Sequence, residues 1–205
     1  MLWNRFCVTF NSVLCMKKIV CMAYGLTLLS MTPAAVSTAL AAVRDPVGLP
    51  AAAITNKQWL NSAPLSLSKL KGNVVLVEFW TFGCYNCRNV EPYVKKWFER
   101  YAGQGLVVIG VHTPEFEHEY KVENVKNYLR KQDIRYPIAI DNDFRTWNAY
   151  ANRYWPAMYL IDKQGIIRYL KIGEGSYDRT ETMIQTLLKE PAANQTGLPS
   201  ISGKQ

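Results

Sequence analysis

The chain has 205 residues, of which 49% are hydrophobic, 12% aromatic and 20% charged, a composition typical of a folded globular protein. A disordered chain would contain fewer aromatic residues and a collagen-like chain far more glycine and proline, so both classes are excluded. The net charge of +8 is not gathered into a dense basic block, so we expect no nucleic-acid partner.

The first 41 residues have the pattern of a secretory signal peptide. Lys17 and Lys18 precede an apolar run at 19–31, and residues 39–41, Ala-Leu-Ala, supply a small-residue cleavage site. The pattern predicts export to the periplasm or another location outside the cytoplasm. Membrane anchoring by an uncleaved leader is the alternative, because no charged residue interrupts the apolar run.

The rest of the chain predicts one domain in which strands and helices alternate. Residues 42–72 are expected to form a loose leading segment, 73–190 the domain and 191–205 a disordered tail. The expected elements, in order, are a strand at 74–80, a helix at 84–101, a strand at 106–112, a helix at 119–132, a strand at 136–141, a helix at 144–154, a hairpin at 157–173 and a helix at 179–190. This order indicates an α/β sandwich with a mixed central sheet.

Cys84 and Cys87 form a CxxC pair directly after the first buried strand, at the start of the following helix. Residues three apart in a first helical turn have Cα atoms about 5 Å apart, which suits a disulfide. The free N–H groups at a helix N-terminus stabilise a thiolate, so Cys84 is the expected nucleophile and Cys87 the resolving thiol. The predicted redox centre is therefore this disulfide, with no metal and no other cofactor.

The segment VEFWTFGCYNC (77–87) resembles the thioredoxin superfamily, and more closely its exported TlpA-like and DipZ-type domains. Pro92 matches the proline of the active-site helix, and Trp155-Pro156 matches the cis-proline loop that faces the CxxC pair. The resemblance runs from about residue 73 to 188. It implies a thioredoxin-like three-layer sandwich with an inserted helix and strand.

The resemblance also implies roles for residues around the cysteines. Glu78 would be a buried carboxyl that takes the proton of Cys87, and Pro156 would be cis, so that the backbone groups of residue 155 face a client peptide. An apolar rim for substrate contact would consist of Trp80, Phe82, Tyr85 and Trp155.

The implied function is an exported thiol–disulfide oxidoreductase that reduces client proteins, with apocytochrome c as one client. It would be recharged by a membrane electron donor of the DsbD or CcdA kind and would act as a monomer. A thiol peroxidase is one alternative, because Thr81 and Cys84 form a T-x-x-C fragment, although Val77 replaces the proline expected before it. A copper-binding chaperone that uses both thiols and His112 is another.

Overall fold

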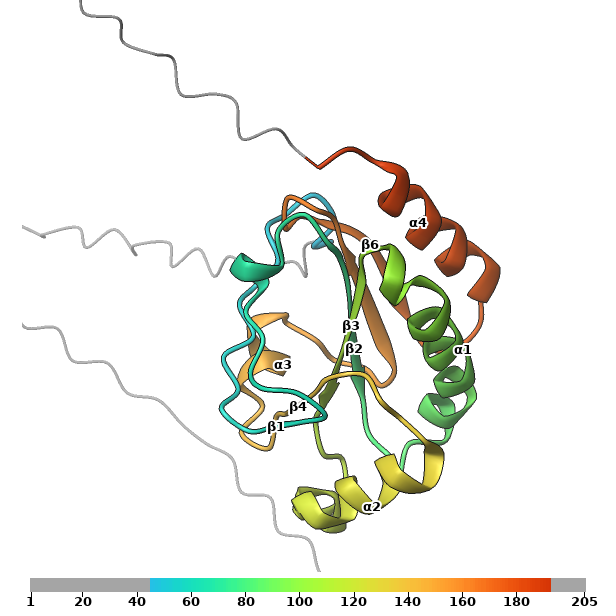
Figure 1. Cartoon of the computed structure of the whole chain (residues 1–205). Coiled ribbons are helices and arrows are strands. Elements are labelled where there is room, and N and C mark those ends of the chain that lie inside the picture. Colours follow the sequence, from blue (N-terminus) through green and yellow to red (C-terminus); the bar gives the residue numbers. More distant parts are fainter. Residues whose placement is uncertain (1–44, 193–205) are drawn as a thin grey trace, which may run out of the picture. The chain divides into compact units, whose positions relative to one another are not determined.

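The computed structural model describes residues 45–192, which are built around a six-stranded mixed sheet (Figure 1). The predicted signal peptide, residues 42–44 of the leading segment and residues 193–205 of the predicted tail lie outside the described residues. Within residues 45–192, no helix combines the length and the apolar character that crossing a membrane requires.

The sheet has the strand order β1-β4-β3-β2-β5-β6. The strands are β1 (Trp59–Leu60), β2 (Val74–Trp80), β3 (Leu106–His112), β4 (Ile138–Ile140), β5 (Ala157–Ile161) and β6 (Ile167–Ile172). β2, β3 and β4 are parallel, whereas β1, β5 and β6 are antiparallel to their neighbours. All seven residues of β2 are buried, as its continuous apolar run predicts for a strand covered on both faces.

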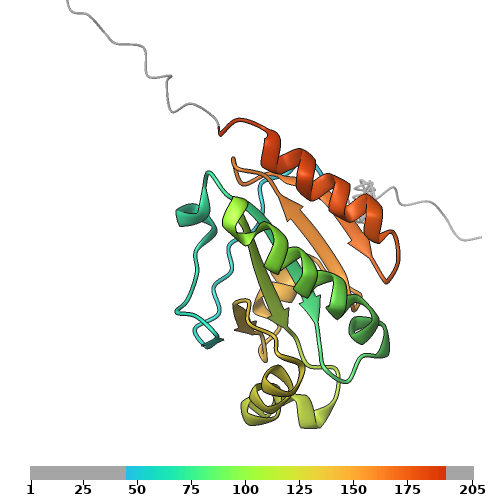
Figure 2. The ribbon, with the colours of Figure 1, turned by 45° about the vertical axis from the view of Figure 1, so that its right-hand side comes forward.

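Helices cover both faces of the sheet. They are α1 (Tyr85–Tyr101), α2 (Val122–Gln132), α3 (Arg145–Ala149) and α4 (Tyr177–Lys189), with 3-10 helices η1 (Leu67–Leu70), η2 (Ala102–Gln104) and η3 (Glu117–Tyr120). α1 and α4 lie side by side on one face, and α3 lies on the other (Figures 1 and 2). The expected thioredoxin-like three-layer sandwich is confirmed.

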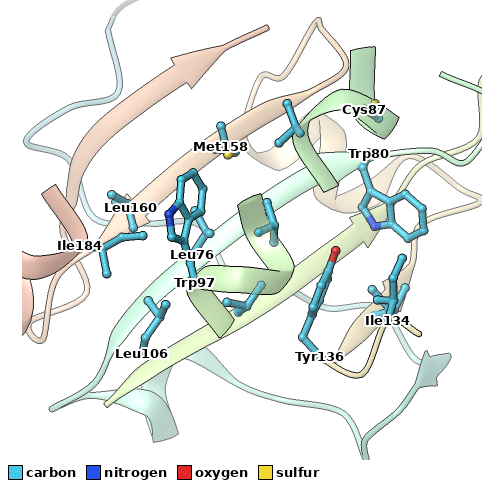
Figure 3. Packing of buried hydrophobic residues seen from close by; sticks show 14 of the residues in the cluster. Leu76, Trp80, Cys87, Trp97, Leu106, Ile134, Tyr136, Met158, Leu160 and Ile184 are labelled. Carbon is cyan, nitrogen blue, oxygen red and sulfur yellow. The ribbon is translucent and has the colours of Figure 1, made fainter. Parts of the chain in front are cut away.

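Each face of the sheet has its own hydrophobic core. On the α1 side, Trp97 packs among residues of β2, β5 and α4, and Figure 3 shows it near Leu76, Leu160 and Ile184. On the α3 side, Phe79 packs against aromatic residues that include Trp147. Because successive side chains of a strand point to opposite faces, the position between Leu76 and Trp80 in β2 also faces α1. That position is Glu78.

Several elements differ in extent from the sequence prediction. The helix expected at 119–132 is split into η3 and α2, because Lys121 between them has extended backbone angles (φ −77°, ψ 107°). The helix expected at 144–154 ends at Ala149, and Ala151 then adopts a left-handed conformation (φ 49°).

The leading segment is packed onto the domain over its described part. Ile54 is 7% exposed, Pro50 forms a β-bridge with Ile166, and β1 pairs with β4. The backbone N–H groups of Gly48 and Ala51 also donate hydrogen bonds to the β5–β6 hairpin. This segment therefore extends the sheet and covers its α3 face.

Candidate active site

Cys84 is the N-cap of α1, where the chain leaves β2 in an extended conformation and enters the helix. Its Sγ accepts a hydrogen bond from the backbone N–H of Cys87 at 3.2 Å. Both residues are free thiols, and their exposed fractions are 9% for Cys84 and 3% for Cys87. The predicted order, with Cys84 outermost and Cys87 behind it, is the order in the structure.

The pKa values of the two thiols are shifted in opposite directions. A hydrogen bond from the Cys87 side chain, helped by the N–H groups of Cys87 and Asn86, lowers the pKa of Cys84 to about 7 despite partial burial and the nearby charge of Glu115. Burial is the largest of the causes that raise the pKa of Cys87 far above that of an ordinary thiol. At neutral pH, Cys84 is therefore partly thiolate, whereas Cys87 keeps its proton.

We expect a titration of the reduced protein, followed by thiolate absorbance at 240 nm, to show one midpoint near pH 7 and no second step below pH 10. The Cys87→Ala variant loses the largest stabilising contact of the thiolate, so its midpoint should move toward the value of about 8.5 for a free cysteine. An unchanged midpoint in Cys87→Ala would show that the helix N-terminus alone sets the pKa of Cys84.

Glu78 lies in the core beneath the cysteines and is 2% exposed. The hydroxyl of Tyr136 donates a hydrogen bond to its Oε2 at 3.4 Å. Burial, reinforced by the charge of Glu91, raises the pKa of Glu78 to about 8. The charge of Glu78 in turn raises the pKa of Cys87. In Figure 3, Cys87 and Trp80 lie at the same end of the core, and the Tyr136 hydroxyl points toward that end.

Two acidic residues near the site were not predicted from the sequence. Glu91, four residues after Cys87 on α1, accepts a hydrogen bond from the Tyr128 hydroxyl at 2.7 Å, and its pKa is raised by burial. Glu119 in η3 is 0% exposed and accepts a hydrogen bond from the backbone N–H of Gly83, which precedes Cys84. The spacing of Glu91 from Cys87 is one helical turn, a signal that would have placed it on the same side of α1.

The predicted apolar rim is present only in part. Tyr85 is 69% exposed, and Phe82 and Trp155 are half-buried. Trp155 donates a hydrogen bond from Nε1 to the Thr113 carbonyl oxygen, and its peptide bond to Pro156 is cis. Trp80 is 3% exposed and packs in the core, so the expectation that it contributes to an exposed rim is wrong.

His112 is a buried, neutral residue. Burial lowers the pKa of His112 to about 4, and its Nε2 lies 3.2 Å from the Thr81 hydroxyl. Within the part of the chain that the structure describes, no three or more His, Cys, Asp or Glu side chains are grouped so as to hold a metal ion. The copper hypothesis, which needs both thiols and His112 together, has no geometric support.

Comparisons with known proteins identify the family of this chain and several of its relatives. The AhpC/TSA family matches residues 47–170. Protein DipZ of Mycobacterium tuberculosis is 47% identical over 135 residues, which cover 64% of this chain and 19% of that protein, so the chain spans about a fifth of this relative. Thiol-disulfide oxidoreductase YkuV of Bacillus subtilis is 30% identical over 134 residues, which cover 65% of this chain and 90% of YkuV.

Solved structures show the same fold. The thioredoxin-like superfamily protein SPOA0173 has a TM-score of 0.66 and 30% identity, over 70% of this chain and 99% of that one. A thioredoxin-like protein solved in its oxidised form has a TM-score of 0.62 and 29% identity, over 68% and 94%. The chain therefore belongs to the AhpC/TSA family, has a thioredoxin-like fold and is a relative of proteins named thiol-disulfide oxidoreductases.

Proposed function

We propose that this chain is an extracytoplasmic thiol–disulfide oxidoreductase that reduces disulfides of client proteins. The observation that carries the proposal is the pair itself: a Cys84 thiol with a pKa of about 7 at a helix N-terminus, with the protonated Cys87 thiol directly behind it. The signal-peptide pattern of the first 41 residues supports a location outside the cytoplasm.

The reaction has two exchange steps. In the first, the Cys84 thiolate attacks one sulfur of a client disulfide; the Cys84–client bond forms, the client S–S bond breaks, and the released client sulfur takes a proton. In the second, Cys87 gives its proton to Glu78, which accepts it in the ionised fraction that a pKa of about 8 leaves near neutral pH, and attacks the Cys84 sulfur. The Cys84–Cys87 disulfide forms, and the second client sulfur leaves with the proton that Glu78 took from Cys87. The client has gained two electrons and two protons.

The oxidised pair must then receive two electrons from a donor. We assign this step to a membrane electron donor of the DsbD or CcdA kind, which supplies reducing equivalents outside the cytoplasm. Apocytochrome c is the client that we propose, because the two cysteines of a C-x-x-C-H haem-attachment motif are needed as free thiols. Recharging by the donor and reduction of the client are both thiol–disulfide exchange reactions, and the relation to a thiol-disulfide oxidoreductase supports that chemistry.

The equilibrium reduction potential of the Cys84–Cys87 couple, measured in glutathione buffers, tests the direction. A nucleophilic cysteine with a pKa near 7 corresponds to thioredoxin, whose potential is about −270 mV, whereas the strong oxidant DsbA combines a pKa of about 3.5 with about −120 mV. We therefore expect a value near or below that of thioredoxin. A value near that of DsbA would overturn the reductant direction and leave an oxidase.

The structure gives no support to the peroxidase alternative. The Thr81 hydroxyl, which completes the T-x-x-C fragment, donates to the carboxylate of Glu119. It therefore accepts its contact with His112 from an Nε2–H, since its single hydrogen is already used. With this hydroxyl held between two buried partners, it is not available to orient a peroxide at Cys84.

A further inference from the structure

Glu119 is a buried carboxylate beside Cys84 that the exchange chemistry does not use. Its side chain joins two segments that are far apart in the sequence. Oε1 accepts the backbone N–H of Gly83 at 2.6 Å, and Oε2 accepts the backbone N–H groups of Glu115 at 2.6 Å and Phe116 at 2.9 Å. These three hydrogen bonds, the Glu119 tie, link the turn that carries Cys84 to the segment between β3 and η3.

The carboxylate of Glu119 is ionised. Burial raises its pKa, but hydrogen bonds from Thr81 and from the three backbone N–H groups outweigh burial, so the pKa lies below its usual value. A buried charge is costly unless it is fully hydrogen-bonded, and bonds to an ionised acceptor are stronger than neutral ones. The tie is therefore a set of charge-assisted bonds, with both oxygens of the carboxylate in use.

The tie also explains the glycine before the nucleophile. A Cβ on Gly83 would lie 2.4 Å from Glu119 Oε1 and 3.1 Å from Phe116 Cδ2. Only glycine lets the two segments approach this closely. Phe116 is thereby held against the residue next to Cys84, yet 48% of its surface remains exposed. Glu115, from the same segment, is close enough for its charge to act on the Cys84 thiol.

We propose that Glu119 is a positioning residue for client binding, which holds Phe116 beside Cys84 as a fixed apolar wall of the client-binding surface. The preferred client segment then carries an apolar side chain next to its disulfide. This inference rests on the proposed function. It concerns the segment between β3 and η3, which touches the client but takes no part in the sulfur exchange.

Glu119→Gln separates the two halves of the tie. A glutamine has one acceptor oxygen and one NH₂ donor. Its oxygen can accept either from Gly83 or from the N–H groups of Glu115 and Phe116, and its NH₂ group then faces the remaining N–H donor or donors. We expect the KM for insulin, a protein disulfide, to rise about tenfold, the scale of a lost hydrogen bond to a charged group. The kcat for insulin and the rate with oxidised glutathione, which is too small to reach Phe116, should stay within about twofold.

Four further variants separate positioning from folding. Phe116→Ala should raise the KM for insulin by a similar factor, because it removes the wall itself. Gly83→Ala alone should raise the KM for insulin as Glu119→Gln does, because the new methyl group meets the Glu119 carboxylate. Combined with Glu119→Ala, which has no carboxylate, Gly83→Ala should raise the KM little further. Glu117→Gln, which removes an exposed carboxylate from the same 3-10 helix, is the matched control and should change nothing.

Amide hydrogen exchange at Gly83, Glu115 and Phe116 reports on the tie without turnover and should be faster in Glu119→Gln. The proposal is overturned if Glu119→Gln keeps the wild-type KM for insulin, or if its rates with insulin and with glutathione fall in parallel. Failure of the proposed function looks different: the wild-type protein would reduce neither substrate.

Discussion

Replacing Cys87 with serine should leave a protein that forms a stable mixed disulfide with its client through Cys84 and no longer turns over. Cys84 keeps its place at the N-terminus of α1 and still attacks, but the thiol that releases the client is gone. We expect the turnover of insulin to fall by about 10³-fold or more, the scale of losing a member of a nucleophilic pair. Non-reducing electrophoresis and mass spectrometry would show the adduct, and dithiothreitol would remove it.

The matched control is Cys84→Ser, which should be equally inactive and should form no adduct. Cys87 is 3% exposed and keeps its proton at neutral pH, so it cannot replace Cys84 as the attacking group. An adduct in Cys84→Ser, or none in Cys87→Ser with any disulfide client, would refute the assignment of nucleophile and resolving thiol.

The parts of this molecule that the sequence predicted well depend on local patterns. The run of apolar and β-branched residues at 74–80 is β2 with the bounds expected, and 106–112 is β3. The CxxC pair begins a helix because an N-cap residue with a side-chain acceptor follows a strand, and Cys84 has that role. Continuous apolar runs and cap positions are set by a few neighbouring residues, so the sequence reveals them.

The parts that were missed depend on contacts between distant segments. Glu115, Glu117 and Glu119 alternate along the chain and look equivalent, yet only Glu119 is buried. What distinguishes it is the N–H of Gly83, 36 residues away. Trp80 was placed on the rim because the resemblance matches it to the tryptophan beside the thioredoxin active site, with core packing as the alternative. The packing of α1 and α2 over it decides for the core.

Replacing Glu78 with glutamine should slow the second exchange step by about 10² -fold, because the variant lacks the carboxylate that receives the Cys87 proton. The first step should be unaffected, since Cys84 is already partly thiolate at neutral pH. In stopped-flow experiments with excess client, the mixed disulfide should therefore form at the wild-type rate and then accumulate. Glu99→Gln, which alters an exposed carboxyl on the same helix α1, is the control and should leave both steps at the wild-type rate.

The same substitution should make the protein more stable above neutral pH. Burial, and then the charge of Glu91, raise the pKa of Glu78 from 4.5 to about 8, so between these pH values the folded state binds a proton that the unfolded state does not. The stabilisation is complete below about pH 4.5 and is lost as the pH rises through about 8, a change on the order of a few kcal/mol. Chemical unfolding from pH 5 to 9 should show this decline in the wild-type protein and a flatter profile in Glu78→Gln.

If Glu78→Gln is no more stable than the wild type at pH 9, the carboxylate is not penalised by burial, and Glu78 would lack the raised proton affinity that its role requires. A buried acid that costs stability in its ionised form is what a proton acceptor for Cys87 must be, because a fully solvated carboxylate would be too weak a base to take a proton from that thiol.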